Sequence, residues 1–160
     1  MSVGGTTFEL TPHNCFACGD LNERGLHLRL HLDEGRCWTK LTLGRDLEGW
    51  DGIAHGGILA AILDEVMVWA LVATDAWGVT ARLTVEFKRP VPVDRPIRAE
   101  GWLTEARRRL LRTEGRILDA ETAELLTRGR AVYVTADAAR KAELKRRYRF
   151  RLVPDREVGS

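Results

Sequence analysis

The sequence GGILAAILDEVMVWALVA, residues 56–73, decides the fold. It is apolar from Ile58 to Ala73 except at Asp64 and Glu65, and its alanine, leucine and methionine residues favour a helix. The run is too long for an ordinary strand, and a helix that is apolar on nearly all sides must be buried. It is also too short for a membrane span, which needs about 20 apolar residues. We therefore predict one long buried helix and no membrane span.

Segments with the period of a β-strand lie on both sides of this predicted helix. Before it, the alternation of apolar and polar residues from Gly25 to Leu43 indicates a hairpin that turns at Asp33-Glu34-Gly35. After it, four further segments are expected to be strands, at residues 79–89, 96–106, 109–118 and 125–136. Only one long helix is available to cover these strands. We therefore expect an α+β fold in which a curved antiparallel sheet wraps around one central helix.

The chain has 160 residues, which is the length of one domain, and a formal net charge of +2. We expect an N-terminal lead-in at residues 1–24, the main domain at residues 25–136, and a basic tail at residues 137–160 that contributes a helix. The net charge is too small to indicate a nucleic-acid partner. Three cysteines do not make a disulfide framework, and residues 1–10 lack the pattern of a secretory signal. These features predict a cytoplasmic protein.

The start of the predicted helix has the properties of a binding site for a negatively charged oxygen. The first amides of a helix have no intrahelical partner, and glycines at positions 56 and 57 let another group approach the backbone closely. Gly57 and Asp64 are seven residues apart, about two helical turns, so they lie on one face. Ala60 and Ala61 lie between them and leave room beside the carboxylate. We therefore predict that Asp64 is the functional acid.

Two other features have less specific patterns. Glu65 is rotated about 100° from Asp64; we keep it as a candidate substrate contact, although a structural salt bridge is the commoner explanation. Cys15-x-x-Cys18, with His13 and His27 nearby in the sequence, permits a zinc site or redox chemistry, but a second cysteine pair is missing. A turn with free thiols is the favoured interpretation, and we predict no metal and no cofactor.

The sequence resembles a known family at this point. The matching segments are His55-Gly56-Gly57, Leu63-Asp64-Glu65, and the lead-in Cys15-Phe16-Ala17-Cys18-Gly19 with Asn22 and Gly25-Leu26. They are similar to hot-dog-fold acyl-CoA thioesterases of the PaaI-like group, over roughly residues 13–136. The resemblance implies a homodimer or a dimer of dimers (a homotetramer), with active sites where two subunits meet.

The resemblance also implies roles for individual residues. Asp64 would be the general base on water or the nucleophile, the amide of Gly57 would hold the thioester oxygen, and Thr80 would supply a hydroxyl from the other subunit. Many members have an asparagine six residues before the histidine, where this sequence has Gly49, so we expect His55 to take over its positioning role.

The predicted substrate is an acyl-CoA, which would be hydrolysed to a free acid and coenzyme A. Expected substrate contacts beyond the catalytic residues are Gly56, Ala60, Ala61, Glu65, Lys88 and Arg89. The last two are candidates for the phosphates of coenzyme A, since arginine matches phosphate geometry well. The alternative is a non-catalytic protein that binds or senses acyl-CoA with the same fold.

Overall fold

The structure is a computed structural model that describes residues 5–155. Two α-helices, a short 3-10 helix and eight strands are present in this part of the chain. In chain order they are β1 (Thr6–Leu10), β2 (His31–Asp33), β3 (Arg36–Thr42), η1 (Arg45–Leu47), α1 (Gly56–Val72), β4 (Gly78–Phe87), β5 (Pro96–Arg107), β6 (Leu110–Asp119), β7 (Leu125–Thr135), α2 (Ala138–Arg147) and β8 (Phe150–Pro154).

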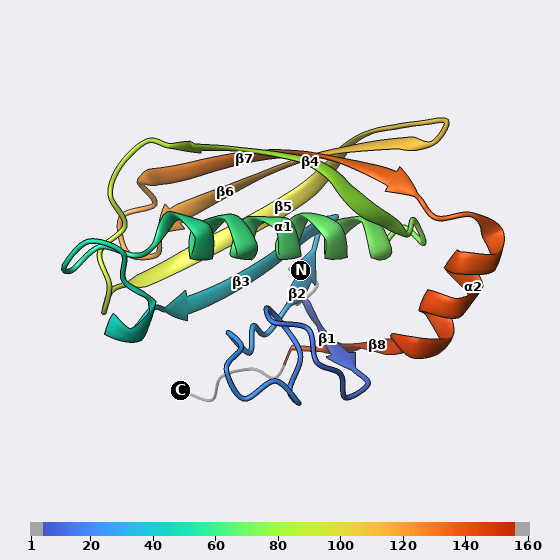
Figure 1. Cartoon of the computed structure of the whole chain (residues 1–160), viewed down its shortest axis with the longest axis horizontal. Helices are drawn as coiled ribbons and strands as arrows, with labels where there is room; N and C mark the ends of the chain where they lie inside the picture. The colour runs from blue at the N-terminus through green and yellow to red at the C-terminus, as the bar shows by residue number, and fades with distance from the viewer. Residues whose placement is uncertain (1–4, 156–160) are drawn as a thin grey trace.

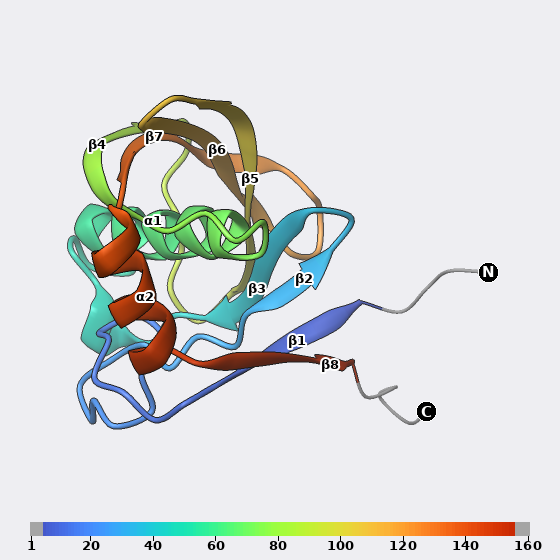
Figure 2. The same cartoon turned by 90° about the vertical axis from the view of Figure 1, so that its right-hand side faces the viewer.

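The strands form one antiparallel sheet in the order β4-β7-β6-β5-β3-β2-β1-β8. Figure 1 shows α1 lying lengthwise against this sheet, and Figure 2, turned by 90°, shows the sheet curving over it. The predicted α+β fold, a curved antiparallel sheet around one long helix, is confirmed. Since the sheet covers α1 on several sides, the helix needs no polar face of its own.

A row of glycines lets α1 approach the sheet closely. Gly101 of β5 pairs with Gly115 of β6, which in turn pairs with Gly129 of β7. A Cβ atom on Gly101 would lie 2.7 Å from backbone atoms of Val66 and Met67 in α1. The helix backbone therefore occupies the space that a side chain at Gly101 would need, and this contact sets the distance between helix and sheet.

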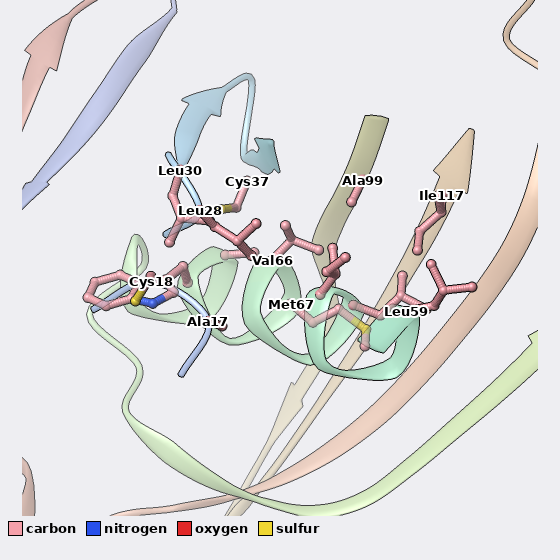
Figure 3. Packing of buried hydrophobic residues seen from close by; sticks show 14 of the residues in the cluster. Ala17, Cys18, Leu28, Leu30, Cys37, Leu59, Val66, Met67, Ala99 and Ile117 are labelled. Carbon is pink, nitrogen blue, oxygen red and sulfur yellow. The ribbon is translucent and has the colours of Figure 1, made fainter. Parts of the chain in front are cut away.

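The core surrounds α1. Figure 3 shows Val66 and Met67 on the side of the helix that faces Ala99 of β5 and Ile117 of β6, and all four side chains are fully buried. Among residues 5–155, no helix is long and apolar enough to cross a membrane.

The predicted strands after α1 are confirmed, but the predicted hairpin before it is only partly right. Residues 25–30 are not a strand, because His27 has a positive φ of 51° that breaks the extended path. The backbone amides of Leu26 and Leu28 instead donate to carbonyls of Phe16 and Ala17. Leu28 is buried, as the alternation predicted. The pattern therefore identified the buried side chains correctly, but the prediction that this segment pairs as a strand was wrong.

The lead-in and the tail both join the main sheet. β1 pairs with β8 over their full lengths, which brings the two ends of the described chain together. Trp69 of α1 packs against Phe8 of β1 and Phe150 of β8, with ring centroids 5.3 and 5.7 Å away. The tail contains the expected basic helix, α2, which connects β7 to β8.

Candidate active site

Asp64 lies in the third turn of α1 on a partly exposed face of the helix. Its Oδ1 atom accepts two hydrogen bonds, one from the hydroxyl of Thr80 and one from the hydroxyl of Tyr133, each 2.9 Å long. The Tyr133 hydroxyl is also 3.2 Å from the backbone oxygen of Asp64. Within residues 5–155, no cation pairs with Asp64 and no hydrogen bond reaches its Oδ2 atom. Oδ1 of Asp64 is thus fixed by two hydrogen bonds, and Oδ2 is available to a ligand.

The sheet places both hydroxyls over Asp64. Thr80 of β4 and Tyr133 of β7 are directly opposite each other in the antiparallel ladder, so their side chains lie on the same face. The register shifts between Thr80 and Arg82, and such a bulge re-aims the neighbouring side chains. Because of this register, two strands converge on a single carboxylate oxygen.

Tyr133 is the site residue that the sequence analysis missed. It is fully buried, and burial, together with the nearby charge of Asp64, raises the pKa of its hydroxyl well above the ordinary value. Tyr133 therefore stays protonated and acts as a donor. The sequence predicts a strand here, but the partner of Tyr133 depends on the register of β4 and β7, which alternation alone does not give.

The structure differs from the expectation for Thr80. The resemblance implied that its hydroxyl reaches the acid of another subunit, whereas here Thr80 contacts Asp64 of the same chain. The physical reason is topological. After α1 the chain turns within a few residues and returns along the helix as β4, so Thr80 passes beside the turn that carries Asp64.

The start of α1 has a histidine cap. His55 is the N-cap residue, and its Nδ1 atom accepts a 2.9 Å hydrogen bond from the backbone N–H of Gly57. This bond fixes the neutral ring as the tautomer with its proton on Nε2. His55 is exposed, so the Nε2–H group is available as a donor at the positive end of the helix.

The predicted role of the Gly57 amide is therefore not what the structure shows. Its N–H group is already used by the imidazole of His55, because a helix N-cap satisfies one of the first free amides. The N–H group of Gly56 has no hydrogen-bond partner among the described residues. Gly56 is also close to Phe87 of β4, whose ring would lie 3.1 Å from a Cβ atom at this position.

The other predicted contacts divide into two groups. Ala60 and Ala61 are half-buried on α1 between its start and Asp64, as the helical spacing predicted. Lys88 and Arg89 directly follow Phe87, so they lie near the start of α1, where both are exposed. Each has an acidic neighbour, since Lys88 pairs with Glu86 at 2.6 Å and Arg89 with Glu124 at 2.5 Å.

Glu65 lies apart from this group. Its carboxylate accepts a 2.9 Å hydrogen bond from the indole N–H of Trp69 and is 3.7 Å from the sulfur of Cys15. Burial raises the pKa of Glu65 to about 7, with the charge of Cys15 as a further cause. The structure does not bring Glu65 together with Thr80, Tyr133 and the available oxygen of Asp64.

The fold and this site define the class of protein: a hot-dog domain whose central helix begins at a His-Gly-Gly cap and carries one acid beside two hydroxyls. Residues 51–126 match the family model of the thioesterase superfamily. Over these residues, just under half of the chain, the sequence is similar to the thioesterase superfamily, and the whole domain has the hot-dog fold.

Solved structures support the assignment of the fold. A thioesterase superfamily protein aligns with a TM-score of 0.72 at 27% identity, covering 76% of this chain and 63% of its own. Thioesterase superfamily member 2 from Mus musculus aligns with a TM-score of 0.61 at 17% identity, over 66% and 84% of the two chains. A hypothetical thioesterase from Streptococcus pneumoniae TIGR4, solved with coenzyme A, gives 0.61 at 16% identity, over 64% and 82%.

One curated relative is similar in sequence. MIOREX complex component 3 from Saccharomyces cerevisiae is 35% identical over 88 residues, which cover 54% of this chain. The match covers 33% of the relative, so this chain corresponds to about a third of that protein's length.

Proposed function

We propose that this protein hydrolyses acyl-CoA thioesters and that Asp64 is its general base or nucleophile. The observation that carries the proposal is the asymmetric environment of the Asp64 carboxylate. Two hydroxyls hold Oδ1, while Oδ2 receives no hydrogen bond from residues 5–155 and lies on a partly exposed face of α1. An acid that only stabilised the fold would be expected to pair with a cation or to be hydrogen-bonded at both oxygens.

The start of α1 supplies the second element of the reaction. A thioester carbonyl placed here would meet the Nε2–H group of His55 and the free N–H group of Gly56. Donors at a helix start stabilise the negative charge that develops on the oxygen, and each is worth about 3–4 kcal/mol in a dry site. In this proposal, the amide of Gly57 keeps the His55 ring in position instead of contacting the substrate.

The proposed steps balance without a metal or a redox cofactor. With Asp64 as general base, a water molecule gives a proton to its carboxylate while the water oxygen attacks the thioester carbon. The tetrahedral intermediate collapses, the C–S bond breaks, and the thiolate of coenzyme A leaves and takes up a proton. General-base assistance of this kind contributes about 10²- to 10⁴-fold in rate.

Two features support coenzyme A as the carrier. Lys88 and Arg89 follow Phe87, which lies against the start of α1, so positive charge is close to the proposed carbonyl site. The Streptococcus pneumoniae relative was solved with coenzyme A. That protein was also crystallised as two separate variants, one with alanine in place of an aspartate and one with alanine in place of a threonine. These two positions are sixteen residues apart, as are Asp64 and Thr80.

We also propose that the protein forms a homodimer or a dimer of dimers. β4 is an outer strand of the sheet, and its Val79 and Phe87 are 61% and 55% exposed. An apolar edge strand next to a partly exposed helix face favours association with a second copy. A second subunit on this side would cover Asp64 and exclude bulk water from it.

The proposal is tested by thiol release from a panel of short-chain, long-chain and aryl acyl-CoAs. A hydrolase releases coenzyme A catalytically from at least one of them. A sensor, the alternative function, binds an acyl-CoA in calorimetry and releases no thiol beyond the uncatalysed rate. Binding without turnover across the whole panel would reject the hydrolase in favour of the sensor.

We expect Thr80→Val and Tyr133→Phe each to lower kcat about 10- to 100-fold, since a hydrogen bond to a charged group contributes about 1.5–3 kcal/mol. KM should hardly change, because both residues position Asp64 and neither is placed against the substrate. Steady-state kinetics measures this effect. The matched control is Thr84→Val, which changes an exposed threonine on the same strand as Thr80. Unchanged kcat in both variants would contradict the positioning role.

We expect His55→Asn to separate the two roles of His55. Asparagine is a good N-cap residue, so the bond from the Gly57 amide is retained and the melting temperature should stay close to that of the wild type. The Nε2–H donor is lost, and kcat should fall about 10²-fold. His55→Ala is the comparison: it loses the donor and also about 1 kcal/mol of stability with the cap. Full activity of His55→Asn would remove this donor from the mechanism.

A further inference from the structure

The loop before β2 gathers three metal-binding side chains that the proposed reaction does not use. The ligand atoms of His13, Cys15 and Cys18 all lie within 4.8 Å of one another. The backbone holds them there, because the amide of Gly19 donates to the carbonyl of Cys15 and that of Leu21 donates to the carbonyl of His13. A Cβ atom on Gly19 would lie 2.4 Å from backbone atoms of His13 and Cys15, so the turn requires glycine after the second cysteine.

Helix α1 places a carboxylate, that of Glu65, next to this cluster. The sulfur of Cys15 is 3.7 and 3.8 Å from the two carboxylate oxygens of Glu65, and the sulfur of Cys18 is 3.4 Å from Nε2 of His13. Ligands of a tetrahedral zinc ion, bound at about 2.0–2.3 Å, are separated from one another by roughly 3.3–3.8 Å. The Cys15–Glu65 and Cys18–His13 separations match edges of such a tetrahedron. Glu65 itself lies outside the group of three side chains whose ligand atoms are all within 4.8 Å of one another, so its carboxylate would complete the site by a shift toward His13 and Cys18.

The surrounding groups orient these donors for a metal. Nδ1 of His13 is 3.0 Å from the carbonyl oxygen of Thr11, which can only accept, so the proton is on Nδ1 and the lone pair of Nε2 is free. The indole N–H of Trp69 donates to Oε1 of Glu65, which leaves Oε2 for an ion. Outer hydrogen bonds of this kind accompany most histidine and carboxylate metal ligands.

The burial of Glu65 is a further observation. This carboxylate is 8% exposed, and no lysine or arginine pairs with it among residues 5–155. A buried carboxylate without a positive partner is costly. His13 and Cys18, in the cluster beside it, are 2% and 9% exposed. Bulk water therefore does not solvate the Glu65 carboxylate from this side. A cation between these side chains would remove the cost.

We propose that His13, Cys15, Cys18 and Glu65 bind one Zn²⁺ ion. Two thiolates, one imidazole and one carboxylate are a ligand set that zinc accepts in a tetrahedral site. Four protein ligands leave no open position, so the ion is structural and fastens the N-terminal loop to the middle of α1. Figure 3 shows the cysteine end of this loop, at Ala17 and Cys18, against the helix. The structure has the turn with free thiols that the sequence predicted, and the proposal assigns a ligand to it. The part of Glu65 was not foreseen, because Glu65 lies fifty positions from Cys15 along the chain.

The test uses tag-free full-length protein, purified from zinc-containing medium with a non-chelating phosphine reductant. Elemental analysis should find about one zinc per chain. Replacement by Co²⁺ should give the absorption of a tetrahedral ion with thiolate-to-cobalt charge transfer. Cys18→Ala and His13→Ala should lose the metal. The matched control is Cys37→Ala, which removes the third cysteine, a buried core residue outside the cluster. The Cys37→Ala variant should keep the metal.

Two further measurements complement the ligand variants, and the second uses only the wild-type protein. Trp69→Phe keeps an aromatic side chain, although a smaller one, and removes the hydrogen bond to Glu65; it should weaken zinc binding about 10- to 100-fold in competition with a chelator. Chelation of the wild-type zinc should lower the melting temperature, because zinc affinity and folding are coupled.

Several outcomes would overturn the proposal. The first is that the wild-type protein contains no zinc and gives no cobalt spectrum, and the second is that its cobalt spectrum lacks thiolate bands. The third is a disulfide between Cys15 and Cys18 under the reducing conditions, and the fourth is equal loss of metal in Cys37→Ala. None of these readouts uses thioester hydrolysis, so failure of the zinc site and failure of the proposed activity are distinguishable.

Discussion

Asp64→Asn is expected to lower acyl-CoA hydrolysis about 10³-fold or more while substrate binding persists. Asparagine has the same shape and still accepts the hydrogen bonds from Thr80 and Tyr133, but it neither takes a proton from water nor attacks a thioester. General-base assistance alone is worth about 10²- to 10⁴-fold. Thiol release gives the rate, and calorimetry with a non-hydrolysable thioether analogue of the substrate gives the affinity.

The control for this substitution is Asp33→Asn, which makes the same chemical change at an exposed position of β2. It should leave kcat and KM unchanged. Equal rates for the wild type and Asp64→Asn would remove this acid from the mechanism. If the rate does fall, hydroxylamine separates the two possible roles, because it traps an acyl-enzyme anhydride that forms only when Asp64 is the nucleophile.

Gly101→Ala is expected to have the largest effect on stability, at least about 3 kcal/mol, which is the upper end for added volume in a packed core. The new methyl group would be 2.7 Å from the backbone of Val66 and Met67, and backbone atoms cannot move aside as a side chain can. For a chain of this size, that loss lowers the melting temperature by about 6–12 °C. Thermal unfolding monitored by circular dichroism measures it.

Gly129→Ala is the matched control, since Gly129 belongs to the same glycine row. Its new methyl group would meet only the ends of Leu63 and Met67, at 3.2 and 3.4 Å, and flexible side chains can shift by such amounts. We expect a loss of less than about 1 kcal/mol, because alanine is also intrinsically better than glycine within a strand. Equal losses at Gly101 and Gly129 would contradict the close backbone contact.

The parts of this structure that depend on local pattern were predictable from the sequence. The helix was expected to begin near Gly56, and it does; the four strands after it appear within a few residues of the predicted ranges. Hydrophobic period and turn residues act over short distances and are visible in one sequence. The position of Asp64 on the same helix face as Ala60 and Ala61 follows from helical geometry alone.

The parts that depend on register and on distant pairing were not predictable. Tyr133 reaches Asp64 only because it is opposite Thr80 in the β4–β7 ladder, and alternation does not tell which residues of two strands face each other. Glu65 meets Cys15 across fifty positions of the chain. The use of the Gly57 amide by His55 is a detail of the N-cap that a motif does not specify.

The pairing of β1 with β8 has a consequence for how the protein is made. Residues 6–10 are translated well before their partner strand at residues 150–154. The outer edge of β1 therefore stays open until β8 has been made, and it closes only through a contact of very high sequence separation. By covering this edge, β8 protects the growing chain against pairing with its neighbours.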